Sequence, residues 1–141
     1  MSILIFYDRI NFRLHHTGEI KRFLEKVIME ENKIPGDLNF IFTDDKSLLQ
    51  INREFLEHDY FTDVISFDYS DKDIVNGEIY ISIDTVRSNA VRFSVPVKKE
   101  AIRVMIHGIL HLLGYLDDTE EKRTVMHGIQ EKRLKEFLGG E

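Results

Sequence analysis

The chain has 141 residues, of which 43% are hydrophobic and 31% charged, a balance typical of a folded domain and not of a disordered chain. It contains no cysteine, which excludes disulfides and thiolate metal sites, so histidine and carboxylate side chains must supply any metal ligands. The net charge of -6 argues against a general nucleic-acid coat protein, and no apolar run approaches the roughly 20 residues that a membrane span requires.

The first half of the chain predicts a strand, a helix and a second strand. Residues 3–7 are almost wholly apolar, which is typical of a strand covered on both faces. A helix is expected from an N-cap at Thr17 to about Glu31. Its apolar positions have the spacing of a core-facing stripe: Ile20, Phe23, Leu24, Val27 and Ile28. The Pro-Gly pair at residues 35–36 is expected to break the chain before a strand at residues 38–44.

The middle of the chain predicts a second helix and two further strands. Asp44 or Asp45 can cap this helix, which is expected to bury Leu48, Ile51 and Phe55. A third strand is expected at residues 63–69, followed by a polar loop at 70–76. Apolar and polar positions alternate at residues 77–84, which indicates a fourth strand.

Three helices are predicted after the last strand. The first runs from about Thr85 through Phe93, and Pro96 suits the first turn of the next, which extends to about Leu113. Asp118 or Thr119 can cap a last helix that ends at residues 139–140. The order β-α-β-α-β-β-α-α-α predicts an α+β fold, with about five helices packed on a mixed four-stranded sheet. Without a repeat or linker, residues 1–141 are expected to form a single domain.

The stretch HGILHLLGYLD, from His107 to Asp117, carries the strongest chemical signal. His107 and His111 are four residues apart, so a helix would present both imidazoles on one face. Gly114 can end that helix with a left-handed turn, which would bring Asp117 back to the same point. Two nitrogens and one oxygen leave the fourth position of a zinc ion open, as in catalytic zinc sites. Asp118 is an alternative third ligand, although a helix cap suits it better.

Metzincin peptidases share this spacing but differ at one position. They have glutamate directly after the first histidine, where it acts as general base. The present chain has Gly108 there, which cannot accept a proton. A metzincin-like hydrolase is therefore the third and least favoured interpretation.

The residues of this stretch resemble the YbeY endoribonucleases, whose hallmark is HGxLHLxGYDH. The resemblance includes Gly108 and covers two further blocks in the family's order. One contains Asn52, Phe55, Asp59 and residues 62–67 (TDVISF), and the other is Gly77-Glu78-Ile79. Asp117 stands where the family usually has a third histidine, and Leu56 stands where it has an arginine thought to serve RNA handling.

Several side chains are expected to contact substrate. Arg103 lies one turn before His107 and could reach a phosphate beside the metal, or it could pair with Glu100. From the third strand, Thr62, Asp63 and Ser66 could present polar groups to substrate. The general base is not identified; Glu78 is only a guess.

The resemblance implies a zinc-dependent, single-strand-specific endoribonuclease acting in 16S rRNA maturation and ribosome quality control. It would hold one Zn²⁺ per chain on His107, His111 and Asp117. Its partners would be single-stranded ribosomal RNA and the small ribosomal subunit or its proteins, in the cytoplasm and without a membrane. The alternative is a metal-stabilised RNA- or ribosome-binding assembly factor with little catalysis. The sequence decides neither the oligomeric state nor whether water or the RNA 2′-hydroxyl attacks the phosphate.

Overall fold

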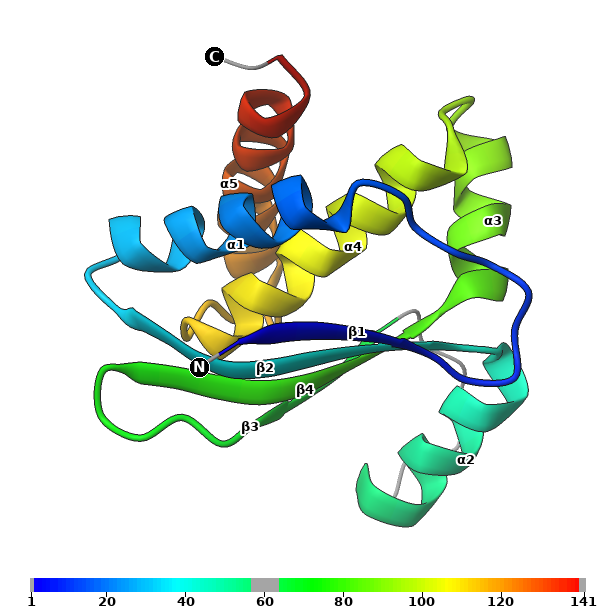
Figure 1. Cartoon of the computed structure of the whole chain (residues 1–141), viewed down its shortest axis with the longest axis horizontal. Coiled ribbons are helices and arrows are strands. Elements are labelled where there is room, and N and C mark those ends of the chain that lie inside the picture. The colour runs from blue at the N-terminus through cyan, green and yellow to red at the C-terminus, as the bar shows by residue number, and fades with distance from the viewer. Residues whose placement is uncertain (1, 57–63, 140–141) are drawn as a thin grey trace.

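The computed structural model describes residues 2–56 and 64–139, which form four strands and five helices (Figure 1). The strands are β1 (Ile3–Tyr7), β2 (Ile34–Thr43), β3 (Val64–Asp68) and β4 (Ile74–Ser82). The helices are α1 (Thr17–Glu30), α2 (Asp45–Leu56), α3 (Ile83–Arg92), α4 (Val97–Leu112) and α5 (Glu120–Gly139). The α+β prediction is confirmed. In this part of the chain no helix has the length and apolar character needed to cross a membrane.

The strands form one mixed sheet in the order β1-β2-β4-β3. β1 pairs with β2, and β2 with β4, in parallel, as expected when helices connect the strands. β3 pairs with β4 in antiparallel fashion, as expected of two strands joined by a short connection. The sheet is therefore parallel over three strands and antiparallel at one edge.

Helices cover the two faces of the sheet unequally (Figure 1). α4 packs on β3 and β4, α1 packs on β2, and α5 packs on α4, whereas α2 lies on the opposite side at one end. Alternation along β4 shows the difference, because Val75, Ile79 and Ile81 are buried while Glu78 and Tyr80 are only partly covered. The main hydrophobic core lies between the sheet and the layer formed by α1 and α4.

β1 corrects one sequence expectation. It is an edge strand, and its side chains alternate between buried Ile3 and exposed Leu4 and Phe6, which are 44% and 47% exposed. The expectation that both faces of this strand are covered was wrong. The helices shield only one face at this end of the sheet, so the apolar side chains on the other face remain in solvent.

The Pro-Gly pair at residues 35–36 does not break the chain but lies within β2. The ladder with β4 changes register between Pro35 and Leu38, an irregularity that accommodates the missing proline N–H. The side chain of Asn76 accepts a hydrogen bond from the Asp37 backbone N–H at 2.8 Å. β2 and β4 are therefore both longer than predicted, and residues 74–76 of the predicted loop belong to β4.

The start of α1 and the packing of α2 differ from the prediction. Thr17 is the first helical residue of α1, and His16 occupies the N-cap position with a left-handed backbone and no side-chain cap. Asp44 does cap α2, because its carboxylate accepts a hydrogen bond from the Ser47 N–H at 2.7 Å. Phe55 is 65% exposed instead of buried, since α2 lies at the margin of the sheet.

The starts of α3 and α5 are also set by side-chain caps. Ser82 accepts a hydrogen bond from the Thr85 N–H, so α3 begins at Ile83, two residues before the predicted start. Thr119 accepts one from the Lys122 N–H at 3.1 Å, which selects Thr119 over Asp118 as the cap of α5.

Candidate metal centre

Helix α4, which carries both histidines, packs very closely against strand β4 of the sheet. A Cβ added at Gly108 would lie 2.7 Å from Ile79 of β4, and one added at Gly77 would lie 2.9 Å from Leu112 of α4. The glycine that replaces the peptidase glutamate therefore permits close packing. His107 lies on a partly exposed face of this helix, with 26% of its side chain exposed.

The turn after α4 brings a carboxylate back to the helix. Gly114 has φ of +100°, a backbone conformation that L side chains rarely adopt. The Gly114 N–H donates to the His111 carbonyl at 3.0 Å, and the Tyr115 N–H donates to the Leu110 carbonyl at 3.1 Å. This pair of bonds is a Schellman motif, and the reversal that it makes returns Asp117 to the histidines.

His107, His111 and Asp117 form one cluster, with ligand atoms that all lie within 4.8 Å of one another. The two Nε2 atoms are 3.0 Å apart, and the Asp117 Oδ2 lies 3.4 Å from the His111 Nε2 and 3.7 Å from the His107 Nε2. Ligands about 2.0–2.1 Å from a tetrahedral zinc ion would be about 3.3 Å apart. The donor set and its spacing therefore fit a tetrahedral metal ion whose fourth position no described residue occupies.

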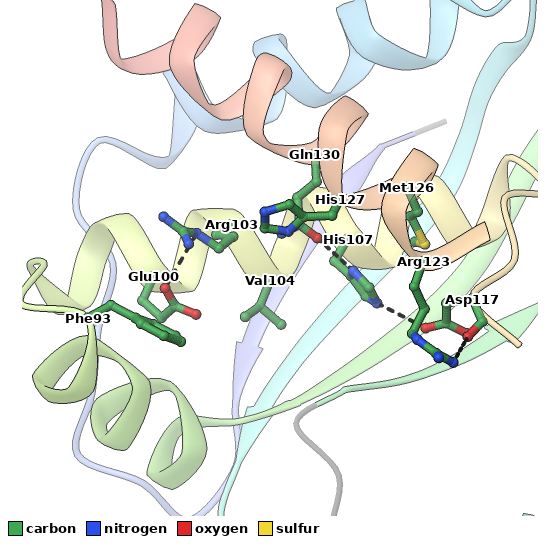
Figure 2. Close-up of a pocket in the computed structure, with 10 residues that line it drawn as sticks. All are labelled: Phe93, Glu100, Arg103, Val104, His107, Asp117, Arg123, Met126, His127 and Gln130. Carbon is green, nitrogen blue, oxygen red and sulfur yellow. Dashed lines mark hydrogen bonds and ion pairs between the residues drawn. The ribbon is translucent and has the colours of Figure 1, made fainter. Parts of the chain in front are cut away.

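The imidazole of His107 is oriented by a residue that the sequence did not single out. Its Nδ1 lies 2.7 Å from the Oε1 of Gln130, which projects from α5 and is 7% exposed (Figure 2). The amide nitrogen of Gln130 donates to the Glu131 carboxylate at 3.1 Å, so its oxygen is left to accept the proton on Nδ1. The lone pair of the His107 Nε2 then points into the cluster, as a metal ligand requires.

The surroundings of the second histidine favour its neutral form. Burial lowers the pKa of the His111 imidazole, and the neighbouring His107 lowers it further. The carboxylate of Asp117 and a hydrogen bond to the backbone of Tyr115 oppose this shift in pKa. A neutral imidazole is the form that binds metal ions.

Arg103 lies in the same cavity as His107 but is already paired (Figure 2). Its Nε is 3.5 Å from a Glu100 carboxylate oxygen, so the alternative of an ion pair with Glu100 is confirmed. Its Nη2 is 3.4 Å from a Glu131 carboxylate oxygen. Two carboxylates oppose the charge of Arg103, which makes it poorly suited to hold a phosphate.

Among the described residues, Ser66 and Glu78 do not join the cluster. Thr62 and Asp63 lie outside the described residues. The Ser66 hydroxyl is buried, and no described residue hydrogen-bonds to it, so a substrate contact there stays a prediction. Glu78 accepts a hydrogen bond from the Tyr69 hydroxyl at 3.2 Å, on the face of β4 opposite Ile79 and α4. It is therefore unsuited to act as a base at the cluster.

Sequence reasoning missed two residues of α5 that lie near the cluster, Gln130 and Arg123. A signal for Gln130 does exist, because it is spaced by four from the buried residues Met126 and Leu134. A glutamine in the middle of a buried stripe needs a polar partner inside the fold. The sequence alone does not say that this partner is His107.

Comparison with known proteins places the chain among endoribonucleases. A family model described as endoribonuclease YbeY matches residues 8–138. Endoribonuclease YbeY of Flavobacterium psychrophilum is 44% identical over 135 residues, which cover 96% of each protein. That of Christiangramia forsetii is 41% identical over 94% of this chain and 92% of that protein. The solution structure of a Thermotoga maritima protein superposes with a TM-score of 0.66 at 30% identity, over 98% of this chain and 90% of that one.

Proposed function

The chain belongs to the YbeY family of endoribonucleases, and from this membership we propose that it is a metal-dependent endoribonuclease specific for single-stranded RNA. The single observation that supports the metal centre best is the cluster of His107, His111 and Asp117 beside an open cavity. We take residues 1–141 to work as one ribonuclease domain. Its substrate would be 16S rRNA during maturation and quality control of the small ribosomal subunit, in the cytoplasm.

In this proposal each residue has a defined part. His107 and His111 would hold one zinc ion through their Nε2 atoms, and Asp117 would hold it through a carboxylate oxygen. Zinc in such a site lowers the pKa of a water molecule and polarises a phosphoryl oxygen. Gln130 fixes the tautomer of His107, and the Gly114 turn fixes the position of Asp117.

A general base is not assigned to any described residue. Among the described residues that line the cavity, the carboxylates are Asp117 and Glu100, and Glu100 is buried and paired with Arg103. Glu100 is also seven residues from His107 along α4, a rise of about 10 Å. It is therefore too far from the cluster to take a proton from a nucleophile held there.

A cleavage assay tests the function directly. Purified protein is incubated with a single-stranded RNA and with its duplex, each with and without a chelator. We expect cleavage of the single strand that the chelator abolishes, that His111→Ala lacks, and that His15→Ala, an exposed histidine distant in sequence, retains. Proteolysis of casein would instead support a hydrolase of the metzincin kind.

The second candidate function is an RNA-binding assembly factor with little catalysis. Two observations favour it, because Leu56 replaces the family arginine and Arg103 is opposed by two carboxylates. Single-stranded RNA that is bound but left uncut with every divalent metal tried would establish this function instead of the nuclease.

The metal proposal has a separate measurement. Elemental analysis should find about one zinc ion per chain, the stoichiometry of a three-ligand site. Asp117→Ala should lower this content. Undiminished zinc in that variant would refute Asp117 as the third ligand and point to Asp118 or His127.

A further inference from the structure

A groove runs from the metal cluster along α4 and α5 to the end of α3 (Figure 2). Its volume is about 330 Å³, within the range of roughly 300–1,000 Å³ that small-molecule sites occupy. His107 and Asp117 stand at one end, and the ring of Phe93 stands at the other. The side chains of Val104 and Met126 add apolar surface between the two ends. The groove thus joins a metal cluster to an aromatic ring across an apolar wall.

The two arginines of the groove differ in what they can bind. Arg103 is paired with Glu100 and Glu131, and only 18% of its side chain is exposed. Arg123 is exposed, and it donates a hydrogen bond to the backbone carbonyl of Asp117 at 3.3 Å. Within residues 2–56 and 64–139 no carboxylate forms an ion pair with Arg123. Its charge is therefore available to an anion beside the cluster.

We propose that this groove binds one unpaired nucleotide of the RNA next to the phosphate that is cut, with Arg123 on a phosphate and Phe93 against the base. This inference rests on the proposed function and deepens it. Phe93 is 50% exposed at the C-terminal end of α3, and the Arg92 guanidinium lies 5.3 Å from the centre of its ring, so part of the ring is accessible to a base. From His107 to Glu100 the groove follows about 10 Å of helix, enough for a nucleoside.

Stacking on Phe93 also gives a reason for single-strand specificity. A base that stacks on Phe93 takes this ring as its partner in place of a neighbouring base. Bases in a duplex are paired and stacked, whereas bases in single strands can be splayed out onto aromatic side chains. A duplex would have to lose one base pair to bind in the same way.

The open face of the sheet is the rival surface for RNA. Phe6 of β1 is 47% exposed there, nearly the same as Phe93, and Tyr69 is 59% exposed. Aromatic side chains on a sheet can also stack on bases. This face lies across the sheet from α4, however, so a base stacked on Phe6 would be far from the metal cluster.

Binding of a labelled single-stranded RNA to the full chain, followed by fluorescence anisotropy, tests the groove. Titrations are made with zinc and again with chelator, where binding is measured without cleavage. Phe93→Ala should weaken binding about 5-fold or more, the lower end for loss of one base stack. Phe93→Leu keeps the apolar packing but removes the flat ring, and it should weaken binding similarly. Arg123→Ala should reduce the slope of log K against log salt by about 0.7, the value for one phosphate contact on a single strand.

Two control variants make the result specific. Lys122→Ala removes an equal positive charge one residue before Arg123. Lys122 lies outside the groove and pairs with Asp118 at 3.2 Å, so this variant should leave the salt slope unchanged. Phe6→Ala should leave the affinity unchanged. Equal effects of Arg123→Ala and Lys122→Ala, or a larger effect of Phe6→Ala than of Phe93→Ala, would overturn the proposal.

These titrations, together with the cleavage assay, separate this inference from the proposed function. Binding that depends on Phe93 and Arg123, in a protein that cuts no RNA, would support the groove while refuting the nuclease. Cleavage by a protein whose RNA affinity is unchanged in both groove variants would support the nuclease and refute the groove.

Discussion

Replacing Gln130 tests how strongly α5 supports the metal centre. Gln130→Leu keeps much of the side-chain volume but removes the oxygen that accepts the proton of the His107 Nδ1 at 2.7 Å. A hydrogen-bonding group left unsatisfied in the interior costs about 1–3 kcal/mol. The His107 side chain is 26% exposed, so water can replace part of the lost contact, and we expect about 1 kcal/mol.

The effect on metal binding should be larger than the effect on stability. Without Gln130 the ring of His107 can rotate or change tautomer, and each change withdraws the Nε2 lone pair from the cluster. Loss of such a supporting residue typically lowers metal affinity 10–100-fold. Competition with a chromophoric chelator measures this affinity, and the visible spectrum of the cobalt-substituted protein reports the ligand geometry.

Matched variants decide between support of the metal and simple packing. Gln130→Glu keeps an acceptor oxygen and should retain most of the affinity. Gln50→Leu removes an exposed glutamine that donates to Glu54 at 2.9 Å, and it should change nothing. Zinc affinity within twofold of the parent in Gln130→Leu, with an unaltered cobalt spectrum, would refute the reasoning even if the melting temperature fell.

Three further predictions concern the backbone and a helix cap. Gly114→Ala forces a left-handed φ on alanine, so it should destabilise the fold by about 1–2 kcal/mol and weaken metal binding. Gly128→Ala, in the helical part of α5, should instead stabilise the fold by about 0.5–1 kcal/mol. Thermal melts that rank the two variants in the opposite order would contradict this. Gly108→Ala should cost about 1–3 kcal/mol, because its methyl group would meet Ile79 at 2.7 Å, and chemical denaturation with no loss of stability would show that the helix can shift. Hydrogen bonds from Ser47, first its side chain and then its backbone, lower the pKa of Asp44 from 3.8, so this cap should stabilise the fold above pH 3.8 and lose its effect as the pH falls further. Asp44→Ala should therefore cost about 0.5–2 kcal/mol at pH 7 and progressively less as the pH falls below 3.8, and a cost that does not change with pH would rule out the charged cap.

The sequence predicted that three side chains would lie together because the geometry that joins them is local. Four-residue spacing on a helix and one glycine turn place His107, His111 and Asp117 without reference to the rest of the fold. Gln130 and Arg123 reach the cluster only because α5 docks on α4, and no spacing within α5 reveals where that helix lies. These contacts depend on tertiary packing.

The errors in the predicted fold also arise from tertiary packing. The sequence of β1 shows that its residues are apolar, but which side chains are covered depends on where the helices lie. A proline usually interrupts a strand, but at Pro35 a register shift and the Asn76 side chain keep β2 paired. A prediction made element by element cannot include a hydrogen-bond partner 39 residues away.

The attachment of α5 sets how long an ion would stay bound. This helix is held on α1 by the ring of Phe137 against Phe23 and by an ion pair between Arg133 and Glu30, and on α4 by the contact of Gln130 with His107. Whenever α5 opens, His107 loses its support while α4 remains on the sheet. The residence time of the metal should therefore follow local opening of α5, and not global unfolding. Amide hydrogens of α5 should then exchange with solvent at the rate at which zinc exchanges, while those of α4 remain protected for much longer.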